Sequence, residues 1–124
     1  MGGDGCAANQ ILYNVTERGA EFDLIPLMRS RGIPAMAYSP IGQGRLPNSP
    51  ALAAVAERHG VTPFTVALAW VLRDPAVIAI PKAADLAHVQ SNRQALDLKL
   101  TEEDLAAIDA DFSPPARKTR LAML

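Results

Sequence analysis

Short apolar runs alternate with segments of helical periodicity along the chain. Residues 9–13 (NQILY), 34–38 (PAMAY) and 77–80 (VIAI) predict three strands. The run at 34–38 lacks polar alternation, which is typical of a strand buried on both faces of a parallel sheet, and the run at 77–80 predicts a further buried strand. Helical spacing of apolar residues, together with flanking caps, predicts helices at residues 21–31, 51–59, 64–73, 85–96 and 101–110.

Several of these helices carry start and stop signals. Ser49-Pro50 and Thr62-Pro63 each place a capping residue before a proline, which suits the first turn of a helix. Thr101 precedes three acidic residues, whose charge is favourable at a helix N-terminus. Gly60 is expected to end the helix at 51–59, because glycine adopts the left-handed conformation of a helix C-cap.

The order of the predicted elements is strand, helix, strand, two helices, strand, two helices and a tail. Strands that alternate with helices predict an α/β fold with a parallel sheet. A sheet of three parallel strands leaves two apolar edges unpaired. We therefore expect the chain to be part of a larger architecture.

The helices predicted at 51–59 and 64–73 are joined by a short turn at Gly60 and could form a DNA-binding helix-turn-helix. The second helix would then need basic residues facing the groove. Residues 66–72 (VALAWVL) are apolar instead, and only Arg73 at the end is basic. The pattern favours a helix that packs against the rest of the domain.

Composition places the chain among ordinary globular domains. It has 124 residues, of which 49% are hydrophobic and 20% charged, and a formal net charge of −1. This balance gives no reason to expect nucleic acid or an anionic membrane as a partner. The single cysteine, Cys6, excludes an intrachain disulfide and favours a cytoplasmic location. No apolar stretch approaches the ~18 residues of a membrane span, and the N-terminus does not resemble a secretory signal.

The candidates for chemistry follow the predicted strands. Lys82 stands between the strand at 77–80 and a helix start, so its ammonium and the helix amides could bind a phosphate together; alternatively it is a solvated loop lysine. Gly42-Gln43-Gly44 lies in a strand-end loop where backbone amides could approach a phosphate, but it lacks the third glycine of a dinucleotide fingerprint. Tyr38 ends a strand, where it is either a core residue or a ring that stacks on a flat ligand.

The sequence pattern offers no metal site and no catalytic set. His59 and His88 have no third ligand nearby, which argues against a bound metal. Paired carboxylates do not stand near a strand end, and no Ser-His-acid set is evident. Composition and pattern alone therefore indicate part of a parallel α/β domain that binds an anion.

Three segments together make the sequence resemble a known family. Residues 9–14 (NQILYN), 37–42 (AYSPIG) and 80–84 (IPKAA, running on to Asn92) resemble, in this order, the last strands of the aldo-keto reductase (β/α)₈ TIM barrel. The likeness runs from about Cys6 to the end and is greatest to bacterial members that reduce methylglyoxal and similar small aldehydes. It implies that residues 1–124 are the C-terminal part of a reductase domain whose N-terminal half is missing.

The resemblance also implies an NADP(H) site. Gln10 would hydrogen-bond the nicotinamide carboxamide, and Tyr38 would stack on the nicotinamide face. Lys82 would pair with the 2′-phosphate that distinguishes NADP from NAD. Further residues would line the pyrophosphate path or contact the adenine end: Ser39, Pro40, Ile41 and Gln43 on the pyrophosphate, and Asn92 on the adenine.

Three positions of the adenine end depart from the common family pattern. Many members have Ser, Arg and Glu where this chain has Ala83, His88 and Ser91. Ala83 and His88 are still predicted to border the cofactor. Arginine would be a permanently charged, bidentate phosphate partner, whereas histidine can be neutral at pH 7. The choice between NADP and NAD therefore stays open at the level of sequence.

The family reduces a carbonyl by hydride transfer from NADPH, with a tyrosine acid supported by Lys, Asp and His. These four residues belong to the first half of the barrel, so we expect no catalytic residue in this chain. Tyr13 and Tyr38 correspond to other family positions. We predict a fragment of an NADPH-dependent reductase that is inactive alone, acts on a small carbonyl substrate only within the complete barrel, and binds no metal. The alternatives are a non-catalytic nucleotide-binding module and a truncated product without function.

Overall fold

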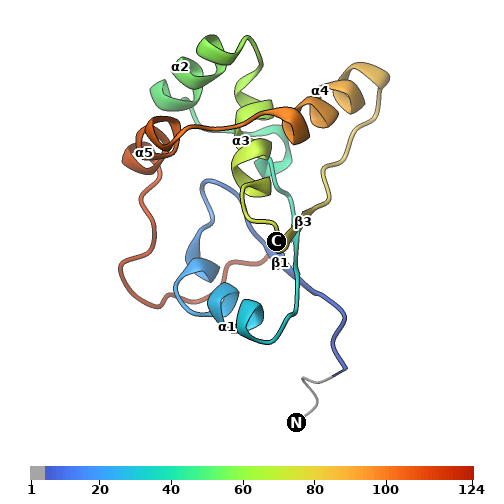
Figure 1. The fold of residues 1–124 in the computed structure, drawn as a ribbon, viewed down its shortest axis with the longest axis vertical. Helices are drawn as coiled ribbons and strands as arrows, with labels where there is room; N and C mark the ends of the chain where they lie inside the picture. The colour runs from blue at the N-terminus through green and yellow to red at the C-terminus, as the bar shows by residue number, and fades with distance from the viewer. Residues whose placement is uncertain (1–4) are drawn as a thin grey trace.

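The computed structural model describes residues 5–124, in which three strands and five α-helices are formed. All strands and helices predicted from the sequence are present. The strands are β1 (Asn9–Leu12), β2 (Ala35–Tyr38) and β3 (Val77–Ala79). The helices are α1 (Leu24–Ser30), α2 (Pro50–His59), α3 (Pro63–Leu72), α4 (Leu86–Asp97) and α5 (Glu102–Asp111), with short 3₁₀ turns at Gly19–Glu21 and Gly42–Gly44 (Figure 1).

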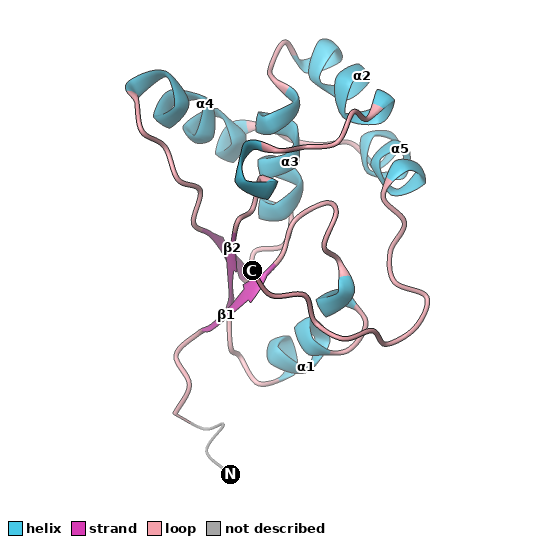
Figure 2. Ribbon diagram, turned by 180° about the vertical axis from the view of Figure 1, so that it is seen from behind, coloured by secondary structure: helices cyan, strands magenta, loops and turns pink. Residues whose placement is uncertain are grey.

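The three strands form one parallel sheet in the order β1-β2-β3. Figure 2 draws the strands in magenta. Their register places Gln10 beside Met36 and Met36 beside Ile78, while Leu12 pairs with Tyr38. Since side chains alternate between the two faces of a strand, these five residues share one face, which we call the open face.

The opposite face of the sheet is buried under helices. Its side chains, including Ile11 and Ala37, join one core cluster with residues of α1 and α3. On the open face, by contrast, Ile78 is 45% exposed. Residues 77–80 were expected to form a buried strand and 34–38 a strand buried on both faces; both are buried on one face only, because α1 and α3 pack on the same side of the sheet.

Local sequence signals set the helix ends. The Ser49 hydroxyl accepts a hydrogen bond from the Leu52 amide, and the Thr62 hydroxyl accepts one from the Thr65 amide. Gly60 ends α2 in the left-handed conformation, with φ of 64°. The helix predicted at 21–31 starts later, at Leu24, because Pro26 has no amide hydrogen and is tolerated only in a first turn.

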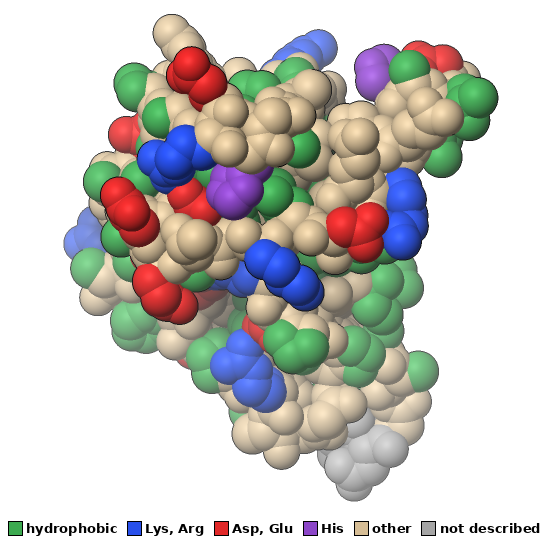
Figure 3. All heavy atoms as spheres, turned by 45° about the horizontal axis from the view of Figure 1, so that its top comes forward, with side chains coloured by type: hydrophobic (Ala, Val, Ile, Leu, Met, Phe, Trp, Pro, Cys, Tyr) green, Lys and Arg blue, Asp and Glu red, His purple; other side chains and the backbone are tan. Residues whose placement is uncertain are grey.

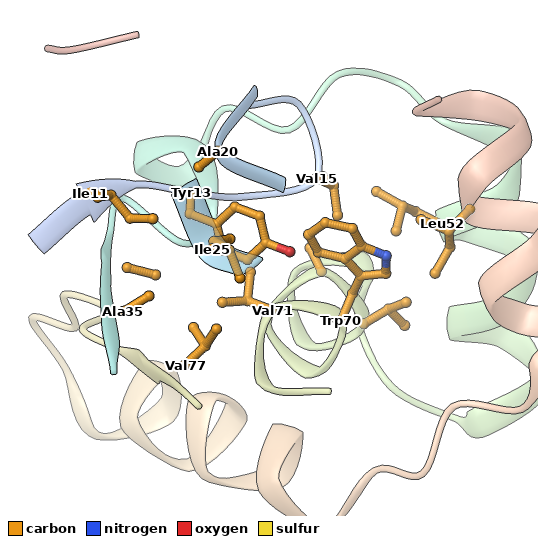
Figure 4. Close-up of a cluster of buried hydrophobic side chains, with 14 of the residues drawn as sticks. Ile11, Tyr13, Val15, Ala20, Ile25, Ala35, Leu52, Trp70, Val71 and Val77 are labelled. Atoms are coloured by element: carbon orange, nitrogen blue, oxygen red, sulfur yellow. The ribbon is translucent and has the colours of Figure 1, made fainter. Parts of the chain in front are cut away.

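Trp70 of α3 lies at the centre of the core and is completely buried. Figure 4 shows its indole between Tyr13 on one side and Leu52 of α2 on the other. The Arg73 guanidinium lies 3.6 Å from the indole centroid and that of Arg18 lies 4.8 Å from it. Both cations are therefore placed to stabilise the ring by cation–π contact.

Asp104 joins α2 to α5. Its buried carboxylate accepts a hydrogen bond from the Thr101 amide at 3.0 Å, bonds His59 Nε2 at 2.7 Å and pairs with Arg58. Burial alone would raise the pKa of Asp104, but these hydrogen bonds outweigh it and hold the pKa well below its ordinary range. The carboxylate therefore stays charged in the folded chain at neutral pH.

We expect Asp104→Ala to lower the free energy of unfolding at pH 7 by about 2 kcal/mol, because a helix cap and two charge-assisted contacts are lost. The folded pKa lies below the ordinary value of 3.8, so this stabilisation is complete at neutral pH and declines as the pH falls below that value. Urea unfolding followed by Trp70 fluorescence measures both effects. The control Glu57→Ala, on the exposed side of α2, should change stability by less than about 0.5 kcal/mol. A wild-type advantage over Asp104→Ala as large at pH 3 as at pH 7 would contradict the assignment.

Candidate cofactor-binding site

Two of the predicted site residues, Tyr38 and Lys82, lie at the C-terminal end of the sheet, and Gln10 lies on the open face two positions before it. Tyr38 is the last residue of β2 and lies on the open face, where it is half-buried. Gln10 lies on the same face, because its register partner Met36 precedes Tyr38 by two residues. Lys82 follows the end of β3 and is exposed. The carboxyl ends of parallel strands are where ligands bind in α/β folds, so Tyr38 and Lys82 lie at a suitable end of the sheet, with Gln10 on the same face as Tyr38.

The loop after β2 is held in an unusual backbone conformation. Ser39 and Gln43 both have positive φ, at 49° and 58°, which is uncommon for residues with a side chain. Pro40 is fully buried, and Ile41 packs against the cluster formed by α3 and α4. The Gln43 side chain is exposed on the turn between two glycines. The loop is thus anchored at Pro40 and Ile41 and presents Gln43 to solvent.

Asn14 fixes this loop to the segment after β1. Its Oδ1 accepts hydrogen bonds from the Thr16 amide at 2.9 Å, the Thr16 hydroxyl at 2.7 Å and the Glu17 amide at 3.0 Å. Its Nδ2 donates to the Ser39 carbonyl at 3.0 Å. The side chain is buried and helps to hold Ser39 in its positive-φ conformation beside Tyr38. Sequence reasoning gave Asn14 no role, although it ends the NQILYN segment.

The helix α4 begins close after Lys82. The Asp85 side chain caps it by accepting from the His88 amide at 2.9 Å, and its other carboxylate oxygen lies 2.8 Å from His88 Nδ1. Ala83 is half-buried between Lys82 and this cap. A lysine, a histidine and a helix N-terminus thus follow β3. Groups of this kind bind phosphate, but here the Asp85 carboxylate bonds both the His88 amide and its ring.

The remaining predicted residues of the adenine end lie on α4 itself. Asn92 is half-buried, and its neighbour Ser91 bonds Thr65 of α3 through their hydroxyls at 2.9 Å. Ser91 therefore ties α4 to α3, and it cannot supply the charge that glutamate has at this position in many aldo-keto reductases.

Tyr13 lies on the buried side of the sheet, away from the open face. Its hydroxyl donates to Glu21 at 2.7 Å and accepts from Arg73 at 3.1 Å. Burial is the largest cause of a strongly raised pKa for this phenol. Tyr13 is therefore a buried structural residue and is not placed to act on a ligand at the sheet edge.

Charge is distributed evenly over the face drawn in Figure 3, where positive and negative side chains are interspersed. Within residues 5–124, no group of three or more His, Cys, Asp or Glu side chains is arranged to hold a metal ion. None of the helices in this part of the chain is long and apolar enough to cross a membrane.

Known proteins share both the sequence and this geometry. A family model described as the aldo/keto reductase family matches residues 1–111. The chain is 42% identical over 128 residues to methylglyoxal reductase YeaE of Escherichia coli (strain K12), which covers 99% of this chain and 45% of that reductase. The chain belongs to the aldo/keto reductase family. A solved aldo-keto reductase from Klebsiella pneumoniae in complex with NADPH superimposes with a TM-score of 0.94 at 44% identity, covering 100% of this chain and 45% of that one.

This aldo/keto reductase chain thus spans less than half the length of the relatives that it matches. A second Klebsiella pneumoniae structure, in complex with NADP and acetate, gives the same TM-score of 0.94 and is covered to 46%. The predicted fold class, an α/β partial (β/α)₈ barrel of three strands with their helices and tail, is confirmed. In a barrel, one face of each strand points inward and the other is covered by helices. The open face of this aldo/keto reductase chain corresponds to the inward-pointing side.

We expect Asn14→Ala to lower the free energy of unfolding by about 2–3 kcal/mol, because several buried hydrogen bonds are lost. The loop after β2 should loosen as well, since the Ser39 carbonyl loses its donor. Denaturant unfolding measures the first effect, and amide hydrogen exchange at residues 39–44 measures the second. The matched control is Asn48→Ala, an exposed position that should leave both unchanged. Equal behaviour of the two variants would show that Asn14 does not hold the loop.

Proposed function

We propose that this chain is the C-terminal, cofactor-binding part of an NADPH-dependent aldo-keto reductase that converts aldehydes or ketones to alcohols. The observation that carries the proposal is that Gln10 and Tyr38 share the open face of the sheet, while Lys82 follows the C-terminal end of the neighbouring strand β3. They are the residues to which the family resemblance assigns the nicotinamide and the 2′-phosphate. A cytoplasmic location fits this chemistry, since NADPH and a free thiol at Cys6 both belong to reducing compartments.

The residues present fit an NADP(H) molecule laid across the edge. An exposed amide at Gln10 can pair with a carboxamide, and a half-buried aromatic ring at Tyr38 can stack on a flat heterocycle. At the other end, Lys82 and the α4 N-terminus suit a phosphate group, and His88, which pairs with Asp85 in this chain, would join them when the phosphate replaces that carboxylate. Ala83 and Asn92, with Ser39, Pro40, Ile41 and Gln43 in the loop after β2, would line the path between the two ends.

Each side chain then has a defined task. When bound, the cofactor supplies the hydride that reduces a carbonyl carbon. Tyr38 would hold one nicotinamide face and leave the other for the substrate. Gln10 would fix the rotation of the ring by hydrogen-bonding its carboxamide. Correct orientation of reacting groups contributes strongly to rate, so these residues would act by positioning.

The proton donor would come from the remaining part of the barrel. The family uses a tyrosine acid supported by Lys, Asp and His, and none of the tyrosines here is placed for that role. Tyr13 is buried with Glu21 and Arg73, and Tyr38 faces the proposed nicotinamide position. We therefore propose that the 124-residue chain alone is inactive. Small aldehydes such as methylglyoxal are the proposed substrates, by similarity to the Escherichia coli relative.

A non-catalytic nucleotide-binding module remains the second candidate, because it would use the same edge residues without a proton donor. The two functions differ in one respect. A reductase part must complete an active barrel, whereas a binding module need not.

A hybrid barrel separates them. The part of methylglyoxal reductase YeaE that this chain does not match is joined ahead of residue 6, and methylglyoxal-dependent oxidation of NADPH is followed by absorbance. We expect activity from the hybrid and none from the 124-residue chain, because general acid catalysis requires a positioned donor. Tyr38→Ala in the hybrid is the matched loss control. A folded hybrid that binds NADPH but turns over no substrate would favour the binding module, and turnover by the isolated chain would contradict the assignment of the proton donor.

Lys82→Ala should weaken NADPH binding about tenfold and leave NADH binding nearly unchanged, because only NADPH carries the 2′-phosphate. Titration of both cofactors into the hybrid, with nicotinamide fluorescence as the signal, provides the measurement. Lys99→Ala, an exposed lysine between α4 and α5, is the matched control for loss of one positive charge. Equal loss for NADPH and NADH in Lys82→Ala would remove Lys82 from the proposed phosphate site.

A further inference from the structure

The C-terminal segment returns to the sheet and touches the proposed nicotinamide residue. After α5, residues 112–124 run past α1, and the C-terminus ends beside the strands in both views (Figures 1 and 2). There the Leu124 backbone amide donates a hydrogen bond to the Tyr38 hydroxyl at 3.3 Å. This contact joins positions 86 residues apart in the sequence.

Four earlier contacts set the course of this segment. Arg18 holds its start, bonding Asp109 at 2.6 Å and the Phe112 carbonyl. Farther along, Lys118 pairs with Asp23 at 2.7 Å. Thr119 then passes so close to Gly19 that a Cβ at that glycine would lie 2.9 Å from the Thr119 hydroxyl. These contacts hold the segment against the rest of the chain, so the Leu124–Tyr38 hydrogen bond is not an isolated contact.

The segment also borders a hollow on the surface of the chain. The hollow, of about 240 Å³, lies between the C-terminal segment and the segment after β1, with Leu12 in its wall. Leu12 is the register partner of Tyr38, although Tyr38 itself does not line the hollow. Its other lining residues come from both segments, among them Thr16, Ser113 and Leu121.

We propose that the backbone amide of Leu124 is a positioning group for Tyr38, holding the ring in the orientation that stacks on the nicotinamide. The inference rests on the proposed function, because it concerns the same cofactor. A half-buried tyrosine at the rim of a sheet can rotate about two side-chain bonds. A hydrogen bond to its hydroxyl restricts that rotation before the ligand arrives, which lowers the entropic cost of binding.

The consequence is confined to one half of the cofactor. NADPH contacts Tyr38 through its nicotinamide, whereas adenosine 2′,5′-bisphosphate carries the 2′-phosphate but no nicotinamide. Loss of the Leu124 contact should therefore weaken NADPH and leave the bisphosphate unchanged. A general disturbance of the fold would weaken both ligands.

The chain offers a matched set of variants. Leu124→Pro removes the donor, because proline has no amide hydrogen, and Leu124→Ala keeps it while removing the same side chain. Tyr38→Phe removes the acceptor and keeps a ring that can stack. The double variant Tyr38→Phe with Leu124→Pro tests whether the two groups act on each other.

Affinities for NADPH and for adenosine 2′,5′-bisphosphate are measured by titration calorimetry on the 124-residue chain and again on the hybrid barrel. We expect Leu124→Pro and Tyr38→Phe each to weaken NADPH about two- to fivefold, the size of one exposed hydrogen bond. The double variant should lose no more than either single one. Leu124→Ala should match the wild type, and the bisphosphate should bind all variants equally.

Four outcomes would overturn the inference. Leu124→Pro and Leu124→Ala could behave alike, Leu124→Pro could bind NADPH more tightly, both ligands could weaken together, or the losses in the double variant could add. In each of these, a wild type that binds both ligands keeps the proposed function intact. A wild type that binds neither ligand in either protein would overturn the proposed function, and the inference with it.

Discussion

The arrangement of the chain depends most on the contacts that the Arg18 guanidinium makes. It bonds Glu21 in the turn after β1 and Asp109 near the end of α5, and it stands over the Trp70 ring of α3. Its side chain is only 7% exposed, so each of its charge-assisted bonds replaces a contact with water. Removing one partner of such a pair would leave a buried charge uncompensated. Arg18 thereby connects the segment after β1, the packing helix and the start of the C-terminal segment.

That connection matters because the sheet itself is covered on one side only. The helices α1 and α3 bury Ile11, Ala37 and their neighbours, while the open face keeps Gln10, Met36 and Tyr38 accessible. In the relatives, which are more than twice as long, the barrel continues around this face. The open face, which no helix of this chain covers, is thus the face that carries the proposed cofactor residues Gln10 and Tyr38. Asn14 and the Leu124 amide both act at this edge, one through Ser39 and the other through the Tyr38 hydroxyl.

Much of the fold could be predicted from the sequence because its signals are local. The caps at Ser49, Thr62 and Thr101 and the stop at Gly60 each act within one helical turn, and the structure confirms all four. The strands were identifiable as short apolar runs. Burial of both faces of 34–38 could not be judged in this way, because it depends on which side α1 and α3 occupy. An apolar run has the same sequence pattern whether its side chains face a layer of helices or the inside of a barrel.

The site was predictable only in part, for a related reason. Tyr38 stands out because it ends a strand and Lys82 because it follows one, and the family resemblance gave them roles. The hydrogen bonds of Asn14 and Leu124 reach 25 and 86 residues along the chain, and no pattern of neighbouring residues indicates them. The position of Asp85 at the start of α4 could be predicted, since an acidic residue is typical of a helix start. Its direct contact with His88, however, depends on side-chain geometry.

The central claim is that NADP(H) binds along the C-terminal edge of this sheet. Backbone amide NMR spectra of the chain, recorded during titration with NADP⁺, test it most directly. The account predicts that chemical-shift changes concentrate at Gln10, at residues 38–43 and at residues 82–92, while α2 and α5 stay unaffected. Shift changes centred on α2 and α5, or none at saturating NADP⁺, would contradict it.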